Sequence, residues 1–363
     1  MKKILFVIPR MGAGGAEKTI SWLSKKLSDS NFEVTVYSLQ NIESFFSLGD
    51  KVTYIHGSII VRSNNIACRR LERLLYFFKA YFEFRKELRN NSYDLVISFN
   101  YSADMLVGLV HFLGHKIKYI CSERNDPNQI NRLKLFFLKR IYREASIFVC
   151  QSKIAYEFYS GFLGNAIIIP NAVDTRNNGV LPQKQKKIIS VGRLDIQKNY
   201  ELLIESFLKV LEERNDYILE IYGDGLEKES LKRKITENGA EKYIYLKGNE
   251  KNIIEKMKEA DFFVMTSDYE GTPNVLLEAM AAGLPVVTTD FSPGTARDYI
   301  KNGNGIIVPC NDSDLLKSAM LKLMGNDKIK TEMSINNISF VSKYDINNIF
   351  PIWVDNINKV LDT

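Results

Sequence analysis

Closely spaced cysteine pairs are missing from this 363-residue sequence. Its four cysteines are scattered along the chain: Cys68, Cys121, Cys150 and Cys310. This spacing excludes the pairs that bind zinc or form a small disulfide framework, and it favours a reducing compartment. The three histidines, His56, His111 and His115, also have no acidic or cysteine partners at zinc-binding spacing. We therefore expect no metal ion and no other cofactor.

Long apolar runs are missing too. The apolar residues Ile4 to Ile8 follow two lysines, but Pro9 ends this run before it reaches the ~7 to 15 residues of a signal peptide. The run Met105 to Leu113 contains His111 and is far shorter than the ~20 residues of a membrane-spanning helix. The sequence predicts a soluble, cytoplasmic protein whose first strand is Ile4 to Ile8.

The charge is unevenly distributed along the chain. Residues 1–172 contain 24 Lys and Arg against 14 Asp and Glu, whereas the remainder contains 25 against 29. A basic half suggests an anionic partner, either nucleic acid or a lipid surface, although ordinary surface charge is an alternative. Cys68 to Arg89 combines apolar residues at helical spacing with seven basic ones. We hypothesise that it docks on the anionic inner face of the plasma membrane, with a core-facing helix as the alternative, and we expect no nucleic-acid partner.

Short apolar runs alternate with longer amphipathic stretches, which is the pattern of parallel sheets with helical crossovers. In the first half we expect a helix at 16–27 and strands at 4–8, 33–38, 94–98, 118–121, 146–150 and 166–169. A polar stretch, 170–187, has the composition of an interdomain linker. After it we expect strands at 187–191, 218–222, 244–247, 261–265, 285–288 and 305–308. The length also exceeds that of one hydrophobic core, so the sequence predicts two α/β domains.

The segment Ser267 to Val287 predicts a loop, a helix and a strand. Thr272 can cap this helix, Pro273 suits its first position and Gly283 ends it. Free amides at the start of such a helix attract a phosphate. The residues that would supply them are Asn274, Val275 and Leu276.

Two carboxylates belong to the same segment. Glu270 lies in the loop before the helix, and Glu278 lies one to two turns into it, close enough to reach another part of the same ligand. A capping charge at Glu270 and a solvated charge at Glu278 are the alternatives. The apolar neighbours of Glu278 count against the second, because an ionised carboxylate in such surroundings needs a partner.

Two cations, Arg193 and Lys198, follow the first strand of the second half. Ligands of parallel sheets bind at the carboxyl ends of the strands, where these residues fall. Cations five residues apart on a loop suit a diphosphate, whose charge grows as a leaving group departs. Ordinary surface charge is the alternative.

A glycine-rich turn, Met11 to Lys18, joins the first strand to the first helix. A dinucleotide-binding fingerprint would have a glycine where Glu17 stands, and an acidic residue at the end of the second strand, which reads Ser38-Leu39-Gln40. Both features are missing, which argues against a dehydrogenase. The turn either lets a ligand approach the backbone closely or is a plain tight turn.

Asp312 and Asp314 have the Asp-x-Asp spacing of metal-dependent sugar transferases. However, they follow an expected strand and begin an expected helix, so helix capping is the better interpretation. A diphosphate balanced by Arg193 and Lys198 also needs no divalent ion. We therefore predict no metal at this site.

With these motifs, the sequence resembles the retaining glycosyltransferases of family 4, which have the GT-B fold, over nearly its whole length. The motifs are Gly12 to Gly15, Ser122 to Pro127, Ile169 to Asp174, Val191 to Leu194 with Lys198, Tyr222 to Gly225, and Glu270 with Glu278. The resemblance implies two Rossmann-like domains that face each other across a cleft. Residues 1–172 would bind the acceptor and 173–344 the nucleotide sugar, while a C-terminal helix, 345–363, would pack back onto the first domain.

The resemblance also implies roles for particular residues. Glu270 would lie by the donor sugar, Glu278 on the ribose hydroxyls, and Arg193 and Lys198 on the diphosphate. The expected catalytic residues are therefore Glu270, Arg193 and Lys198. The expected donor-binding residues are Gly14, Gly15, Gly223, Gly225, Lys247, Gly271, Thr272, Asn274, Val275, Leu276 and Glu278.

On the acceptor side, many family members carry a histidine after the strand expected at 94–98. Here the chain reads Ser98-Phe-Asn-Tyr-Ser, so no histidine role transfers. The expected acceptor-side residues are Asn100, Tyr101, Glu123, Arg124 and Asn125. The segment Ser122 to Pro127 resembles transferases that build bacterial surface polysaccharides and lipid-linked oligosaccharides. It implies a UDP-linked hexose or N-acetylhexosamine as donor, and a glycan or polyprenyl-linked acceptor.

Two other functions fit the same fold. A sugar-nucleotide epimerase would need an acid and a base for chemistry at C2 of the sugar. A non-catalytic module would bind the nucleotide sugar without turnover, and the intact pair Glu270 and Glu278 counts against it. The resemblance therefore favours a retaining transferase that uses the nucleotide sugar as a substrate and needs no metal.

Overall fold

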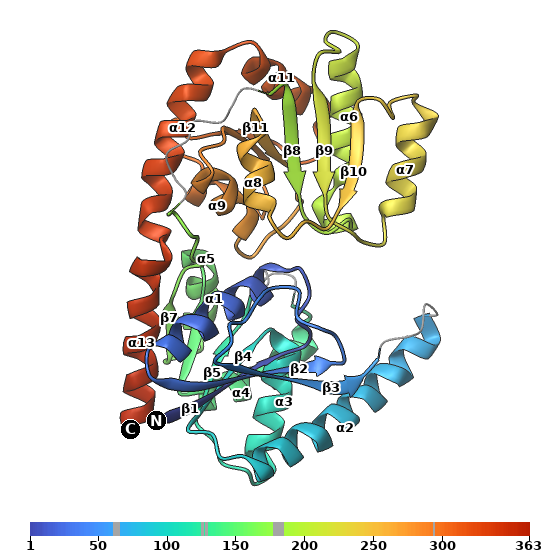
Figure 1. Cartoon of the computed structure of the whole chain (residues 1–363). Helices are drawn as coiled ribbons and strands as arrows, with labels where there is room; N and C mark the ends of the chain where they lie inside the picture. Colours follow the sequence, from blue (N-terminus) through green and yellow to red (C-terminus); the bar gives the residue numbers. More distant parts are fainter. Residues whose placement is uncertain (61–65, 125–126, 128–129, 177–184, 293–294) are drawn as a thin grey trace. The chain divides into compact units, whose positions relative to one another are not determined.

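The computed structural model of the chain describes residues 1–60, 66–124, 127, 130–176, 185–292 and 295–363, with the backbone alone at 66–74 and 132. Part of the expected linker, 177–184, therefore lies outside the described residues. The chain divides into two compact units, coloured from blue to red along the sequence in Figure 1. Unit 1 comprises Met1–Asn171 and Ile349–Thr363, and unit 2 comprises Ala172–Asn348.

Unit 1 is built on a parallel sheet that has seven strands among the described residues, in the order β3-β2-β1-β4-β5-β6-β7. The strands are β1 (Lys2–Ile8), β2 (Phe32–Gln40), β3 (Val52–Ile59), β4 (Leu95–Phe99), β5 (Tyr119–Ser122), β6 (Ile147–Cys150) and β7 (Ala166–Ile168). The sequence analysis did not predict β3. This strand lies at the edge of the sheet and is half exposed, so it has no continuous apolar run.

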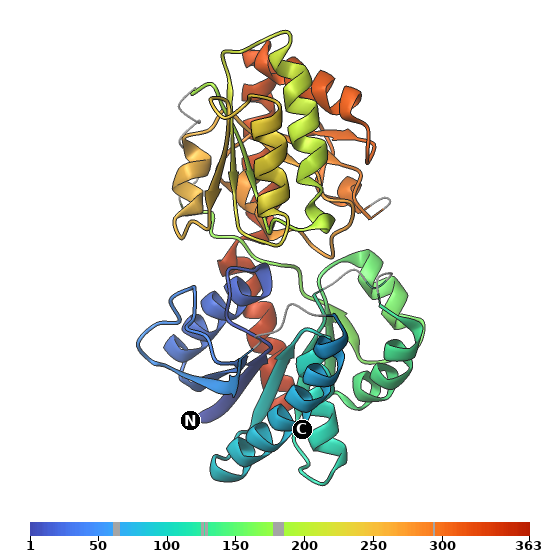
Figure 2. The ribbon, with the colours of Figure 1, turned by 90° about the vertical axis from the view of Figure 1, so that its right-hand side faces the viewer.

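Helices cover both faces of this sheet. They are α1 (Gly15–Asp29), α2 (Ile66–Asn90), α3 (Tyr101–Phe112), α4 (Arg132–Glu144), α5 (Lys153–Ser160) and α13 (Ile346–Asp362). The side chains of Leu5 and Val7 pack in one core cluster with residues of α2 to α5. Because successive residues of a strand point to opposite faces, Phe6 faces the other side with Phe99, on which Trp353 of α13 stacks. Figure 2 shows α2 and α13 on opposite sides of the sheet.

Unit 2 contains a second parallel sheet, with six described strands in the order β10-β9-β8-β11-β12-β13. The strands are β8 (Lys187–Val191), β9 (Ile218–Tyr222), β10 (Ile244–Gly248), β11 (Phe262–Met265), β12 (Val286–Thr289) and β13 (Ile306–Val308). The helices are η2 (Ile196–Lys198), α6 (Tyr200–Leu211), α7 (Lys228–Glu237), α8 (Ile253–Lys258), α9 (Asn274–Ala281), α10 (Ala296–Tyr299), α11 (Ser313–Met324), α12 (Asp327–Val341) and η3 (Ser342–Tyr344).

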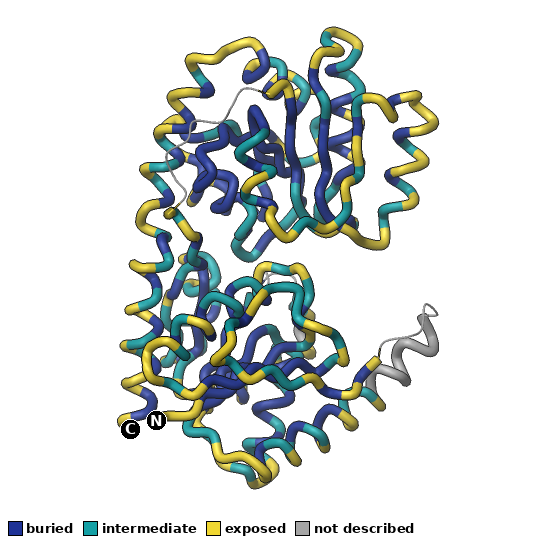
Figure 3. The backbone as a smooth tube through the Cα atoms, viewed as in Figure 1, coloured by how far each residue is buried: buried dark blue, intermediate teal, exposed yellow. Residues whose placement is uncertain are grey.

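Each unit has its own buried core around its central strands, drawn dark blue in Figure 3. Burial on both faces explains why these strands read as continuous apolar runs rather than as alternating patterns. Among the described residues, no helix combines the length and the apolar character that crossing a bilayer requires. Parallel sheets bind their ligands at the loops that follow the carboxyl ends of the strands. The candidate site residues are therefore expected in these loops.

Candidate active site

In unit 2 the loops that follow β8 and β9 are hydrogen-bonded to each other. The amide of Gly192 donates to the carbonyl of Tyr222 at 2.9 Å, and the amide of Leu194 donates to the carbonyl of Asp224 at 3.0 Å. Arg193 lies between these two bonds. The sheet pairing of β8 with β9 thus continues into the loop and fixes the backbone at Arg193.

Two glycines after β9 make this close approach possible. A Cβ atom at Gly223 would lie 1.8 Å from the carbonyl oxygen of Gly192, and one at Gly225 would lie 2.2 Å from that of Leu194. Gly223 also has a φ of 144°, which side chains rarely adopt. The glycines expected to bind the donor therefore have a packing role that the sequence did not disclose, because they position the backbone on both sides of Arg193.

The two catalytic residues expected on different loops, Lys198 and Glu270, form a buried ion pair. The Lys198 Nζ contacts Glu270 Oε1, and the two side chains are only 14% and 9% exposed. The Ser267 Oγ donates to the same carboxylate oxygen at 2.6 Å, and the Glu270 amide donates to the Ser292 Oγ at 3.0 Å. Glu270 is therefore held in place as a carboxylate near a cation, and capping does not explain it, since the cap of α9 involves no side-chain hydrogen bond.

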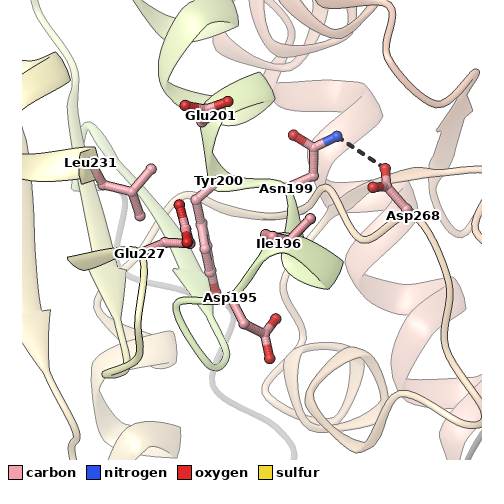
Figure 4. Close-up of a pocket in the computed structure, with 8 residues that line it drawn as sticks. All are labelled: Asp195, Ile196, Asn199, Tyr200, Glu201, Glu227, Leu231 and Asp268. Carbon is pink, nitrogen blue, oxygen red and sulfur yellow. Dashed lines mark hydrogen bonds between the residues drawn. The ribbon is translucent and has the colours of Figure 1, made fainter. Parts of the chain in front are cut away.

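Further bonds tie the Glu270 loop to the Lys198 loop. The amide of Asp268 donates to the carbonyl of Gln197 at 2.9 Å, and Gln197 Nε2 donates to the carbonyl of Tyr269 at 2.7 Å. Asn199 Nδ2 donates to Asp268 Oδ1 at 2.9 Å, which Figure 4 marks with a dashed line. These bonds thus fix the two loops that carry the charged groups relative to each other.

Helix α9 begins later than expected. Its N-cap is Pro273, with an extended backbone at φ −79° and ψ 97°, so the interpretation of Thr272 as the cap is wrong. The Leu276 amide donates to the Pro273 carbonyl at 3.1 Å, so the expectation that this amide is free is also wrong. The cause is the position of the cap, because the first hydrogen bond of the helix then uses Leu276. The amides of Asn274 and Val275 are left at the end of the helix.

Two side chains of α9 bear on the same site. The Asn274 Oδ1 atom is buried and has no hydrogen-bond partner among the described residues. Glu278 is 8% exposed, so the alternative of a solvated charge is wrong. Gly271 and Thr272 join the Glu270 loop to this helix. The helix that follows the Glu270 loop therefore has a buried polar atom at its start, on Asn274, and a buried carboxylate further along, on Glu278.

The remaining donor-binding candidates are less closely grouped. Arg193 is largely exposed, and its Nη2 lies 3.3 Å from Asp195 Oδ2. Lys247, at the end of β10, has its Nζ 3.6 Å from Glu220 Oε1. Gly14 and Gly15 belong to unit 1, where Gly14 is the N-cap of α1 and Gly15 its first residue, whereas the other donor-binding candidates belong to unit 2.

A small pocket lies beside η2 (Figure 4). It is lined by Asp195, Ile196, Asn199, Tyr200, Glu201, Glu227, Leu231 and Asp268. Four of these side chains are acidic and none is a lysine or arginine. Repulsion between like charges therefore argues against this pocket as the diphosphate site.

The expected acceptor-side residues lie at the ends of β4 and β5 in unit 1. Asn100 precedes α3 with a positive φ of 74°, and its amide donates to the Ser122 carbonyl at 3.2 Å. Tyr101 begins α3, and Lys134 Nζ lies 4.7 Å from the centre of its ring. Asn125 lies outside the described residues.

Arg124 has specific partners within unit 1. Its guanidinium lies 4.4 Å from the centre of the Phe99 ring, and Nη1 donates to Asn171 Oδ1. Burial lowers the pKa of Arg124 to about 9, against the opposing effect of Glu123, so the group still carries its charge at neutral pH. Arg124 is thereby held at the end of β5.

The sequence analysis missed a buried acid that lies next to Glu123. Asp104 is fully buried, and Ser98 Oγ donates to its Oδ1 at 2.6 Å. The Tyr142 hydroxyl lies 3.2 Å from Asp104 Oδ2 and 3.4 Å from Glu123 Oε2. The pKa of Asp104 is raised well above its usual range, mainly by burial and to a smaller extent by the charge of Glu123. Burial and the neighbouring carboxyl group therefore both disfavour the charged form of Asp104. Its position within an apolar helix is the only local signal of its burial in the sequence.

The aspartates at 312 and 314 have structural roles. The Asp312 side chain caps α11 by accepting from the Leu315 amide at 2.9 Å, so the capping interpretation is confirmed. Asp314 Oδ1 lies 2.7 Å from Lys209 Nζ. In the part of the chain that the structure describes, no group of three or more His, Cys, Asp or Glu residues is arranged to hold a metal ion.

Comparisons with known proteins concern the family and the fold of the chain. The family model described as Glycosyltransferase Family 4 matches residues 13–177, and that described as Glycosyl transferases group 1 matches residues 173–340. An N-acetylgalactosaminyltransferase of Campylobacter jejuni, named for an acceptor linked to diphospho-undecaprenol, is 27% identical over 91% of this chain and 92% of its own length. The amylovoran biosynthesis glycosyltransferase AmsD of Erwinia amylovora is 26% identical over 99% of this chain and 100% of its own.

A solved structure confirms the fold. HepE of Anabaena, crystallised with UDP, superposes with a TM-score of 0.75 and 17% identity over 99% of this chain and 100% of its own. Each of the two units has a sheet of parallel strands, and the fold matches that of the solved structure of HepE. The two family models together cover residues 13–340. The chain belongs to glycosyltransferase family 4 and is a glycosyltransferase of the GT-B fold.

Proposed function

We propose that this glycosyltransferase moves a hexose or N-acetylhexosamine from a UDP-sugar to a lipid-linked or glycan acceptor in the assembly of a bacterial surface polysaccharide. The names of the Campylobacter and Erwinia relatives support the acceptor class, and the UDP in HepE supports the nucleotide. The observation that carries the proposal is the buried pair of Lys198 and Glu270, next to the polar end of α9.

In this proposal the donor binds to unit 2. The diphosphate accepts hydrogen bonds from the Asn274 and Val275 amides, and Lys198 neutralises the charge that grows as the sugar departs. Arg193, which is exposed and paired only at the surface, turns toward the same phosphates. Glu270 lies by the sugar and Glu278 on the ribose hydroxyls. No divalent ion takes part, since these groups occupy the place where its acidic ligands would stand.

The transfer proceeds with retention of configuration. The anomeric bond breaks through an oxocarbenium-like state, and the departing phosphate itself takes the proton of the acceptor hydroxyl. The acceptor binds to unit 1, near Asn100, Tyr101, Glu123 and Arg124.

The enzyme works in the cytoplasm, at the inner face of the plasma membrane, where a lipid-linked acceptor is found. The basic character of residues 1–172 supports an anionic surface as partner. Exposed apolar side chains on α2, at Leu75, Phe78 and Phe82, support contact of this helix with lipid. Most of its arginines lie among residues 66–74, whose side chains are outside the described part.

A panel of UDP- and GDP-sugars tests the proposal. A donor present at 100 times its Kd should stabilise the protein by about 2.7 kcal/mol, which a thermal melt detects. The same donor should be transferred to an undecaprenyl-linked acceptor, and NMR should show the product with the anomeric configuration of the donor. Epimerised donor without an acceptor would point to an epimerase, and stabilisation without turnover would point to a binding module.

A further inference from the structure

Helix α4 leaves three large apolar side chains exposed to solvent. Leu133, Phe136 and Phe137 are 68%, 71% and 57% exposed. Their spacing of three and four residues places them on one face of the helix. The opposite face, with Leu138 and Tyr142, is fully buried in the core of unit 1. The helix therefore has a second apolar face that contributes nothing to the core.

The neighbouring helix α3 extends this surface. Its residues Tyr101, Met105, Leu109 and Phe112 follow one another at helical spacing and are all partly exposed. The two helices pack closely, because Gly108 leaves room for Ile141: a Cβ atom at Gly108 would lie 2.5 Å from that side chain. The outer faces of α3 and α4 thus form one apolar surface, which we call the α3–α4 face.

Cations line the α3–α4 face. Lys134 Nζ lies 4.7 Å from the centre of the Tyr101 ring, and the Arg140 guanidinium lies 4.9 Å from that of Phe112. Lys139 of α4 adds a third positive charge at the border of this face, where its Nζ lies 4.3 Å from the centre of the Phe162 ring. The acidic residue of α4 is Glu144, at its C-terminal end. Aromatic and aliphatic side chains bordered by lysine and arginine match the chemistry of an anionic bilayer, which has acyl chains below a layer of phosphates.

The position of this face in unit 1 fits a flat partner. Helices α2, α3 and α4 lie in a row on the same side of the sheet, with α3 in contact with both neighbours (Figure 2). Their outer sides therefore point away from the sheet together. The exposed residues of α2, Leu75, Phe78 and Phe82, stand in the same layer of helices. A row of helices with apolar outer sides offers a broad contact area to a bilayer.

We propose that the α3–α4 face docks on an anionic lipid bilayer, with Phe136 and Phe137 inserted at the level of the headgroups. Lys134, Lys139 and Arg140 lie against the lipid phosphates. The proposal rests on the proposed function only in that the acceptor is held in the same membrane. The docking would also place Tyr101, the first residue of α3, close to the lipid surface from which the acceptor comes.

Vesicle sedimentation of the full chain tests this surface at low salt, with phosphatidylcholine alone and with added phosphatidylglycerol. The wild type should bind the anionic vesicles and not the neutral ones. The double variant Phe136→Ser/Phe137→Ser should lose this binding, while its melting temperature stays unchanged because both rings are exposed. Lys139→Gln/Arg140→Gln should weaken binding on the order of 30-fold, since each cation near such a surface contributes roughly fivefold.

Two control variants sharpen the experiment. Leu315→Ser/Ile335→Ser removes exposed apolar side chains from unit 2 and should leave lipid binding unchanged. Phe78→Ser/Phe82→Ser alters α2. If only this α2 variant loses binding, docking belongs to α2 and the proposal is wrong. Light scattering that shows a dimer of the wild type and a monomer of Phe136→Ser/Phe137→Ser would also overturn it, by assigning the face to a second copy of the chain.

Transfer assays distinguish failure of the docking proposal from failure of the proposed transferase function. Phe136→Ser/Phe137→Ser should transfer sugar to a water-soluble acceptor at the wild-type rate and lose rate only with acceptor embedded in anionic vesicles. Equal rates of both proteins on embedded acceptor would contradict the docking surface and leave the transferase activity intact. Lipid binding without transfer from any nucleotide sugar would instead contradict the proposed donor.

Discussion

The ion pair of Lys198 and Glu270 makes a quantitative prediction, because the two residues are both buried and both proposed to act on the donor. Lys198→Ala leaves the Glu270 carboxylate with the hydroxyl of Ser267 but without its cation. Removal of one partner from a buried pair costs about 3–5 kcal/mol. We expect the free energy of unfolding to fall by about 3 kcal/mol, the lower end, since Lys198 is still 14% exposed.

The double variant Lys198→Ala/Glu270→Gln removes both charges and should be more stable than Lys198→Ala. Neighbouring residues that interact show coupling energies of about 0.5–3 kcal/mol, and a buried pair belongs near the upper end. Urea unfolding of the wild type, both single variants and the double variant measures this coupling. A coupling near zero would contradict the ion pair.

The transfer rate, unlike the stability, should not recover in the double variant. Removal of one electrostatic contact to the transition state costs about 2.7–4 kcal/mol, or a hundredfold to a thousandfold in rate. Lys198→Ala and Glu270→Gln should each lose at least this much, and the double variant should not recover it although it recovers stability. Initial transfer rates at saturating donor provide the measurement. Lys209→Ala, which breaks an exposed pair with Asp314, serves as the control. Near-normal turnover by the double variant would refute the catalytic role of the pair and leave it with a structural role alone.

Three further predictions concern the metal, the glycine turn and the buried acid. Transfer rates should survive EDTA, and activity that EDTA abolishes and manganese restores would contradict the diphosphate site. Gly223→Ala should destabilise unit 2 by about 1–3 kcal/mol and raise the KM for the donor, because the added Cβ atom would collide with Gly192. The control Gly239→Ala, also at positive φ but with open space around it, should leave the KM for the donor unchanged. The raised pKa of Asp104 gives stability that is fully present below the unfolded pKa of ~3.9 and is lost as pH rises toward the folded value. Urea unfolding should therefore show Asp104→Asn gaining stability relative to the wild type as the pH rises above ~4, and a difference that stays constant with pH would contradict a raised pKa of Asp104.

Local patterns predicted much of unit 2 correctly. A buried strand, a polar loop and a helix follow one another in the segments around Arg193 and Glu270, and each pattern is complete within about 20 residues. The start of α9 was misplaced by one residue, because Thr272 and Pro273 both suit a helix start and only the backbone decides between them. The same type of pattern failed for β3, whose half-exposed residues give no buried run.

The acceptor side of unit 1 was less predictable, because its contacts join residues far apart in the sequence. Tyr142 is 38 residues from Asp104 and 19 from Glu123, so no window of a strand or helix contains the three together. The Tyr142 hydroxyl has a single proton and lies near both carboxyl groups. It can donate this proton either to Asp104 or to Glu123, and it therefore links the two carboxyl groups. Glu123 thus shares a hydrogen-bonding hydroxyl with a buried acid that only the folded chain brings near it.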